Sequence, residues 1–241
     1  MSRAGGGLDT GVTDAGVTRR LSPMQKMTIG KLRSGQEGKV PVTIAAEVRA
    51  DGLLAVCAER RAENEQVTVT AVLAYLLART LADHAALNAA LVDDETMIQY
   101  ADVNLGIAVA LEDGSLVVPV VHAAQERDLD DLAAAVAELA GKARAKSLGL
   151  PDLRGGTFTL SSTGMVRLPI TGTPLLTPGQ SGILLAGGAA PRPVVEDGAV
   201  VAGQVLPLSL TFDHAVVNGV PALRFLEDLG GRVESPFRWL P

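Results

Sequence analysis

The chain has 241 residues, of which 47% are hydrophobic and only 3% aromatic, and its 21 basic and 27 acidic residues give a net charge of −6. This hydrophobic content excludes global disorder, and the acidic balance argues against nucleic-acid binding, which typically relies on a basic stripe or on aromatic stacking platforms. The only cysteine, Cys57, excludes an intrachain disulfide and a multi-cysteine metal site, and it fits a reducing cytoplasm. We predict no metal site, because the histidines and carboxylates lack ligand spacing.

The N-terminal residues predict a flexible tail. Residues 1–20 are rich in Gly and Thr and have no apolar core of a signal peptide. The longest apolar run, residues 67–81, contains Arg79 and is shorter than the roughly 20 residues that span a bilayer. We therefore expect no membrane segment and a single domain over residues 21–241.

Capping residues and hydrophobic periodicity predict the elements of the first half of the chain. These are a helix over 22–34, a strand over 40–48, a helix over 51–63, a buried helix ending near His84 and a short strand over 96–100. We expect Asp51 to cap the second helix, and Thr68 or Thr70 to cap the third.

The second half alternates hairpins with helices. The predicted elements are strands over 103–111 and 115–121 joined by a turn at 113–114, a helix over 128–146, strands over 157–161, 181–186 and 205–212, a turn at 196–198 and a helix over 220–229. A long loop is expected over residues 163–182. Helices interleaved with hairpins favour an α/β sandwich with a mixed sheet.

Among the three histidines, His214 stands out because it lies where a strand ends and a turn begins. Side chains at strand ends are exposed on a rigid backbone, and an unperturbed imidazole has a pKa suited to general base catalysis near neutrality. By spacing alone, a strand-end histidine is still more often structural. We expect His84 and His122 to be surface or capping residues.

The segment around His214 also resembles a known signature. Residues 208–219, LSLTFDHAVVNG, are similar to the D-H-R-x-x-D-G motif of the 2-oxo acid dehydrogenase acyltransferases, whose H-x-x-x-D-G core also occurs in chloramphenicol acetyltransferase. Further segments resemble that family in the same order, at 103–110, 113–121, 157–164 and 178–187. The resemblance extends from about residue 21 to residue 229 and implies a chloramphenicol acetyltransferase-like fold that forms trimers.

The resemblance implies an activity and three site residues. Members of the family move an acyl group between the thiol of a dihydrolipoyl arm and that of coenzyme A, without an acyl-enzyme. His214 matches the general base, and Ser161 matches the serine that donates to the oxyanion, with Ser162 as the competing alignment. Asn218 stands where most relatives have Asp, and it either supports the site or simply forms a turn with Gly219.

Several positions depart from the family pattern. Ala215 replaces the arginine of the motif, Val42 replaces a common histidine, and Gln25 replaces a common arginine, for which Lys26 or Arg33 could substitute. These differences bear on the acyl donor and acceptor more than on the base.

The resemblance also implies partners. The sequence contains no recognisable lipoyl domain or peripheral-subunit-binding domain, so we expect either a free-standing acyltransferase or an excised core. Its acyl group would come in trans from a lipoyl domain, an acyl carrier protein bearing phosphopantetheine, or acyl-CoA, with a thiamine-dependent 2-oxo acid decarboxylase as an upstream partner. We expect a homotrimer or a larger shell, with His214 from one subunit facing Ser161 of its neighbour.

Two other functions stay open at this point. One is a non-catalytic trimeric scaffold, which the departures at Ala215 and Asn218 would permit. The other is a small-molecule acetyltransferase of the chloramphenicol type, although those enzymes usually carry a histidine where this chain has Asp213.

Overall fold

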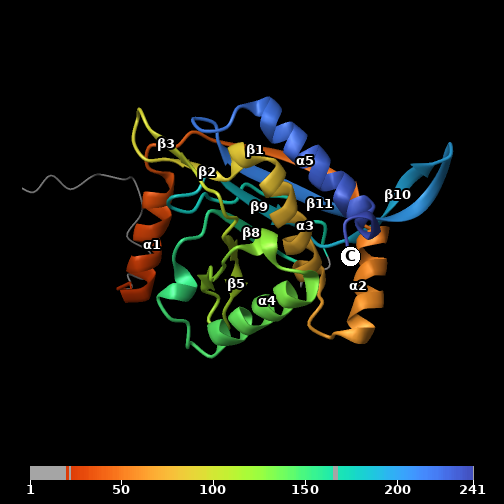
Figure 1. The fold of residues 1–241 in the computed structure, drawn as a ribbon, viewed down its shortest axis with the longest axis horizontal. Coiled ribbons are helices and arrows are strands. Elements are labelled where there is room, and N and C mark those ends of the chain that lie inside the picture. Colours follow the sequence, from red (N-terminus) through yellow and green to blue (C-terminus); the bar gives the residue numbers. More distant parts are fainter. Residues whose placement is uncertain (1–19, 22, 165–167, 241) are drawn as a thin grey trace, which may run out of the picture.

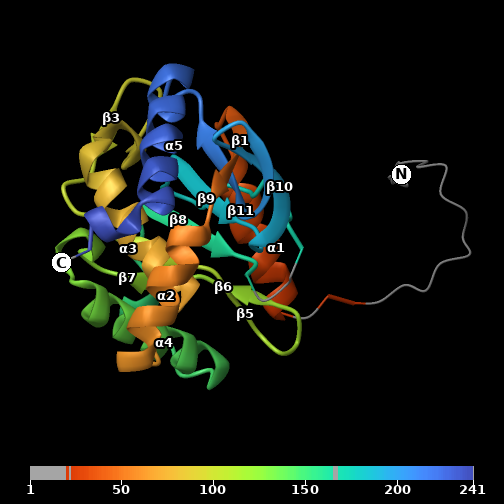
Figure 2. The ribbon, with the colours of Figure 1, turned by 90° about the vertical axis from the view of Figure 1, so that its right-hand side faces the viewer.

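The computed structural model describes residues 20–21, 23–164 and 168–240. The predicted tail therefore lies outside the described residues, apart from Arg20. Among the described residues, seven strands form one mixed sheet, and helices α2 to α5 cover one of its faces (Figures 1 and 2). In the described part of the chain, no helix is long and apolar enough to cross a membrane.

The first half of the chain follows the predicted order. It contains α1 (Pro23–Gln36), β1 (Pro41–Arg49), α2 (Asp51–Glu63), α3 (Val69–Asp83), β2 (Ala89–Leu91) and β3 (Met97–Gln99). The three helices and the strands β1 and β3 are confirmed. Strand β2 is not predicted, because its residues, Ala, Ala and Leu, include no β-branched or aromatic side chain; it pairs with β3 in a separate two-stranded sheet.

The two predicted caps have different outcomes. Thr68 is the N-cap of α3, and its hydroxyl accepts a hydrogen bond from the Ala71 N–H at 3.2 Å. The prediction that Asp51 caps α2 is wrong, since Ala50 is the N-cap residue and makes no side-chain cap bond. Asp51 instead accepts hydrogen bonds from Arg49 Nε at 2.8 Å and from the Gln204 N–H at 3.1 Å, and so links α2 to a strand far along the chain.

The predicted hairpin forms, but in two pieces. Its strands are β4 (Leu105–Ile107), β5 (Val109–Ala110), β6 (Leu116–Val117) and β7 (Val120–Val121). Strand β4 pairs with β7 within the main sheet, whereas β5 pairs with β6 outside it. The turn contains Gly114, whose φ of +78° lies in the left-handed region that favours glycine.

The second half contains two elements longer than predicted and one that is new. It comprises α4 (Leu129–Arg144), β8 (Phe158–Ser162), β9 (Gly182–Ala186), β10 (Ala190–Glu196), β11 (Ala199–Asp213) and α5 (Gly219–Glu234). Short 3-10 turns occur at Ala85–Leu87, Ala124–Glu126, Pro151–Leu153 and Pro236–Arg238.

Strand β10 is not predicted because Pro191 and Pro193 argue against a strand. Both are accommodated because β10 lies outside the main path of the sheet and pairs with β11 through the turn expected at 196–198, of which residues 197 and 198 lie between the strands. Helix α5 continues five residues beyond the predicted end. Its Gly230 backbone approaches Val48 so closely that a Cβ there would lie 3.1 Å from Val48 Cγ1, so packing retains a glycine that sequence alone suggests as a helix end.

The strand order is β1-β11-β9-β8-β4-β7, with β10 paired to β11. Strand β8 runs parallel to β4 and β9, and the other pairings in the sheet are antiparallel. The prediction of a mixed sheet is therefore confirmed.

The two faces of the sheet are buried by different elements. Leu210 and Phe212 of β11 join the apolar core beneath the helices. Ser209 points to the other face but is also buried, because the loop over residues 168–181 covers that side and the Gly172 N–H donates to Ser209 Oγ at 3.3 Å. The Ser209 hydroxyl on this face thus finds a hydrogen-bond partner in the backbone of the covering loop, residues 168–181.

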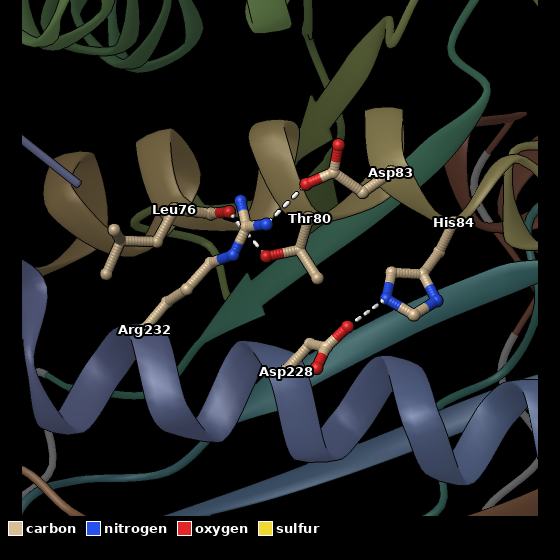
Figure 3. Close-up of polar contacts among 6 residues, drawn as sticks. All are labelled: Leu76, Thr80, Asp83, His84, Asp228 and Arg232. Atoms are coloured by element: carbon tan, nitrogen blue, oxygen red, sulfur yellow. Dashed lines mark hydrogen bonds and ion pairs between the residues drawn. The ribbon is translucent and has the colours of Figure 1, made fainter. Parts of the chain in front are cut away.

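Polar contacts join the C-terminal end of α3 to α5 (Figure 3). Arg232 of α5 donates to the Asp83 carboxylate, and His84 Nε2 lies 2.6 Å from Asp228 Oδ2. Within α3, the buried Thr80 hydroxyl donates to the Leu76 carbonyl at 2.8 Å. The contacts of Arg232 with Asp83 and of His84 with Asp228 hold the two helices together over the sheet that carries the candidate site.

Gly182 provides a direct test of this packing. A Cβ at Gly182 would lie 2.9 Å from Cδ2 of the fully buried Phe158 ring, whereas a Cβ at Gly141 in α4 would meet no atom within 4 Å. We expect Gly182→Ala to lower the free energy of unfolding by about 1–3 kcal/mol through overpacking. The control Gly141→Ala should raise it by up to about 1 kcal/mol. Urea unfolding measures both changes, and equal effects of the two substitutions would contradict the packing described.

Candidate functional site

His214 directly follows the last residue of β11 and is exposed. Its backbone N–H donates to the Val40 carbonyl at 2.8 Å, which ties the strand end to the residue before β1. Its imidazole lies 5.7 Å from the Phe212 ring, centroid to centroid, at an angle of 36°. The backbone at His214 is therefore anchored while the ring remains accessible from outside the chain, as the sequence predicts for a strand-end base.

Asn218 occupies the N-cap position of α5, four residues after His214. Its backbone is extended, with φ −73° and ψ 159°, but its side chain makes no capping hydrogen bond. The residue is exposed. The turn lies before Asn218, at residues 214–216, so Asn218 and Gly219 begin the helix instead of forming a turn of their own, and the amide group is not used to cap the helix.

Ser161 and Ser162 end β8 and point to opposite faces of the sheet, as successive strand residues do. Ser162 faces the helices, where its Oγ accepts a hydrogen bond from Thr70 Oγ1 at 3.2 Å. Ser161 shares its face with Thr159, whose hydroxyl donates to Gln180 Oε1 at 2.6 Å within the covering loop. The two candidate serines therefore lie in different environments.

A cavity of about 700 Å³ opens beside Ser162. Its walls come from α2, α3, α4 and the ends of β4, β5 and β8, and most of its lining side chains are small and aliphatic. Its polar lining residues are Glu65, Gln66, Thr68, Thr70, Arg144 and Ser162. A cavity of this size, mostly apolar with a few polar groups, fits a small organic ligand. Sequence reasoning did not find this cavity, because its lining residues come from elements that are far apart in the sequence.

The strand register separates Ser161 from His214. Ser161 pairs with Leu185 of β9, and Leu185 pairs with Ser209 of β11, so Ser161 lies level with Ser209. His214 is five residues further along, which is about 17 Å in an extended strand. One chain therefore does not bring the serine and the histidine together.

Residues 214–217 form the turn and bend after β11, which we call the histidine turn. The cation beside it is neither Lys26 nor Arg33, the two that the sequence suggested. Lys26 and Arg33 are exposed on α1. Lys39, in the segment between α1 and β1, donates from Nζ to the carbonyls of Gln180 and Thr177, the latter at 3.3 Å. Burial lowers the pKa of Lys39, and the nearby negative charge of Asp213 partly offsets that effect.

The other two histidines make structural contacts, as predicted. His84 is the C-cap residue of α3 and pairs with Asp228, and its ring packs edge-on against Phe225 at 5.6 Å. His122 is exposed, and its Nε2 lies 3.3 Å from the Pro151 carbonyl oxygen. In the described part of the chain, no group of three or more His, Cys, Asp or Glu side chains could hold a metal ion.

One protein family matches nearly the whole chain. The model of the 2-oxoacid dehydrogenases acyltransferase family, catalytic domain, matches residues 14–240. The chain belongs to this family. The resemblance noted at the histidine motif thus extends over nearly all of the acyltransferase domain.

Curated relatives of this acyltransferase domain are components of larger systems. The chain is 33% identical over 222 residues to the dihydrolipoyllysine-residue acetyltransferase component of the acetoin cleaving system of Bacillus subtilis, covering 90% of this chain and 55% of that protein. It is 34% identical to the corresponding component of the pyruvate dehydrogenase complex of Mycobacterium tuberculosis, over 91% of this chain and 41% of that protein. The chain therefore spans about half, or less, of the length of these relatives.

Solved structures confirm the fold. A probable dihydrolipoamide acetyltransferase from Listeria monocytogenes superposes with a TM-score of 0.84 at 28% identity, covering 92% of this chain and 96% of that one. The dihydrolipoamide acetyltransferase of Azotobacter vinelandii, studied for the roles of a serine, a histidine and an asparagine in its catalytic mechanism, gives 0.86 at 30% identity, with 91% and 92% covered. Chloramphenicol acetyltransferase shares the fold, with a TM-score of 0.56 at 19% identity over 87% of this chain and 92% of that one.

Cys57 of the acyltransferase domain should be inert in the folded state. Burial raises the pKa of its thiol to about 11, whereas an unfolded cysteine has a pKa of about 8.5. We expect no reaction with 5,5′-dithiobis(2-nitrobenzoate) at pH 8 within minutes, and one thiol per chain in denaturant. Because the folded pKa is the higher one, the thiol contributes stability below about pH 8.5 that is lost as the pH rises towards 11. Rapid labelling of native protein at pH 8 would contradict this.

Proposed function

We propose that the chain catalyses acyl transfer between the thiol of a dihydrolipoyl arm and that of coenzyme A, with His214 as general base, Ser161 as oxyanion donor and Asn218 in support. The family match over residues 14–240 carries this proposal. Spacing adds support: the histidine and asparagine studied in the Azotobacter vinelandii enzyme are four positions apart, as are His214 and Asn218.

The chemistry requires one base and one hydrogen-bond donor. His214 takes the proton of the attacking thiol, because a thiol with a pKa of about 8.5 is mostly protonated at pH 7. The new carbon–sulfur bond forms a tetrahedral oxyanion, to which the Ser161 hydroxyl donates. When the old carbon–sulfur bond breaks, the His214 imidazolium returns its proton to the departing sulfur. No bond to the enzyme forms, and no proton is gained or lost overall.

Asn218 is suited to a supporting role. Its side chain is not used for capping, and its amide can both donate and accept hydrogen bonds near His214. Unlike the aspartate of most relatives, it cannot form an ion pair, and Ala215 leaves no motif arginine that would need one. The uncharged residues Asn218 and Ala215 thus stand where the family motif has an aspartate and an arginine.

The site forms between copies of the chain. His214 lies about 17 Å beyond Ser161 along the strand direction and two strands away from it, so a complete site needs the serine of one copy and the histidine of the next. A closed homotrimer gives each copy this heterologous contact, and larger shells could be built from such trimers. One structurally similar protein forms the cubic core of a pyruvate dehydrogenase complex.

The cavity lies on the helix side of the sheet, so it would hold the arm that carries a thiol to the site if the oxyanion donor is Ser162 rather than Ser161. A pantetheine arm is a narrow chain with apolar and amide groups, which suits small aliphatic walls with hydroxyls at Thr68 and Thr70. Arg144 on the rim could pair with a phosphate.

The partners follow from this chemistry. The acyl group would arrive on a lipoyl domain or on an acyl carrier protein, with a thiamine-dependent 2-oxo acid decarboxylase upstream. The relatives are components of acetoin-cleaving and 2-oxo acid dehydrogenase systems, which supports a lipoyl-borne donor. A cytoplasmic location stays a prediction.

Single substitutions test the assigned roles. The assay mixes the protein with acetyl-CoA and dihydrolipoamide and measures the free CoA released by mass spectrometry. We expect His214→Ala to lower kcat by about 10²–10⁴-fold and Ser161→Ala by about 10²-fold. His122→Ala, which removes an exposed histidine bonded to a backbone carbonyl, is the matched control and should leave kcat unchanged. Turnover that survives His214→Ala would rule out the base, and absence of turnover in the wild type with any CoA, lipoyl or pantetheine thiol would support the scaffold function.

Ser162→Ala decides between the two serines. In the Azotobacter vinelandii enzyme the serine precedes the histidine by 52 positions; Ser162 lies at that separation from His214, and Ser161 lies one position further away. We still assign the role to Ser161, because Ser162 already accepts a hydrogen bond from Thr70. Ser162→Ala should therefore cost less kcat than Ser161→Ala, and the reverse order would transfer the oxyanion role to Ser162.

Complementation tests the shared site. We expect Ser161→Ala and His214→Ala chains, each inactive alone, to regain activity when unfolded and refolded together. In a mixed trimer one site in about three combines an intact serine with an intact histidine, so an equal random mixture should recover about one quarter of wild-type activity. Mixing the two variants without refolding is the control. No recovery after refolding would mean that both groups act within one chain.

A further inference from the structure

Asp213 is a buried carboxylate directly before His214. Its residue is 2% exposed. One of its oxygens, Oδ1, accepts hydrogen bonds from the Val40 N–H at 3.0 Å and from the Ala215 N–H at 3.1 Å. Burying a carboxylate is costly unless it is hydrogen-bonded, and here the donors that bond it are peptide groups flanking the base. The carboxylate thus bonds the backbone on both sides of the turn.

Backbone bonds close the same turn. The His214 N–H donates to the Val40 carbonyl at 2.8 Å, while the Val40 N–H returns a bond to the Asp213 side chain. The N–H groups of Val216 and Val217 donate to the Asp213 carbonyl at 3.0 and 2.9 Å. Every one of these bonds either involves Asp213 or fixes the peptide of His214.

A positive charge accompanies the carboxylate. Lys39 is half-buried, its Nζ donates to the Thr177 and Gln180 carbonyls, and it interacts electrostatically with Asp213. The Asp213 N–H in turn donates to the Ser181 carbonyl at 2.9 Å. The covering loop, the segment before β1 and the histidine turn are thus joined around Asp213.

We propose that Asp213 is a positioning residue for acyl transfer, whose carboxylate fixes the turn that presents the His214 imidazole to the neighbouring copy. This inference rests on the proposed function, because Asp213 acts only through His214 and touches no reacting atom. Without Asp213 Oδ1, the Val40 and Ala215 N–H groups lose their acceptor, and the turn after β11 is released. A displacement of about 1 Å between reacting groups can cost about 100-fold in rate.

The first test compares Asp213 with Asp51, which form hydrogen bonds at opposite ends of the β1–β11 pairing. Asp213→Ala should lower kcat by about 10- to 100-fold with KM changed less than about twofold. The matched control is Asp51→Ala, because Asp51 accepts from the Gln204 N–H of β11 and from Arg49 of β1, far from His214. Asp51→Ala should lower stability and leave kcat unchanged.

The conservative variant separates the acceptor from the charge. Asp213→Asn retains an Oδ1 that can accept both N–H groups, so it should recover most of the kcat lost in Asp213→Ala. If Asp213→Asn is as impaired as Asp213→Ala, the backbone acceptor is not what matters and the proposal is overturned.

A double-mutant cycle distinguishes positioning from general structural support. If Asp213 acts through the imidazole, Asp213→Ala should lower the residual rate no further when His214 is already Ala. A further loss as large as that in the wild-type background would overturn the proposal.

Hydrogen exchange tests the turn without relying on activity. We expect the amides of residues 214–217 to exchange at least about tenfold faster in Asp213→Ala than in the wild type, and at the wild-type rate in Asp51→Ala. Unchanged exchange in Asp213→Ala would overturn the proposal. An inactive wild type would refute the proposed function instead, while exchange would still decide whether Asp213 holds the turn.

Discussion

The hydrogen-bond ladder of β11 is the constraint on which the rest of the structure depends. This strand pairs with β1 over nine residues, with β10 at its start and with β9 near its end. Because a slip of one residue would turn every side chain to the other face, the ladder fixes both the core and the polar face. It also fixes where the strand stops, and therefore where His214 emerges.

The same ladder explains why the proposed reaction needs more than one copy of the chain. Register places Ser161 level with the middle of β11 and His214 beyond its end. A rigid sheet does not bend to close that gap, whereas a second copy can present its own strand end to the serine. In the proposed trimer, association would place His214 of one copy beside Ser161 of the next without strain in either chain.

The departures from the family motif fall around the histidine turn, and the structure shows what stands there instead. Val42 pairs with Phe212 in the β1–β11 ladder, so an apolar residue takes the place of a histidine beside the turn. Ala215 contributes its N–H to Asp213 rather than a guanidinium to the site. The charges near the turn are Lys39 and Asp213, and they bind backbone groups. The turn is thus held by hydrogen bonds between the Asp213 side chain and peptide groups.

Local sequence determined the helices α1 to α5, the break after β11 and the candidacy of His214, because capping residues, hydrophobic period and a strand-end motif are all contained within a few neighbouring residues. Tertiary structure alone decided the rest. It admitted Pro191 and Pro193 into β10 at an edge, gave Asp51 a partner on β11 in place of a cap, and carried α5 past Gly230. It also assembled the cavity beside Ser162 and brought the Val40 N–H to Asp213 Oδ1 across more than 170 residues, since such contacts arise only when distant strands pair.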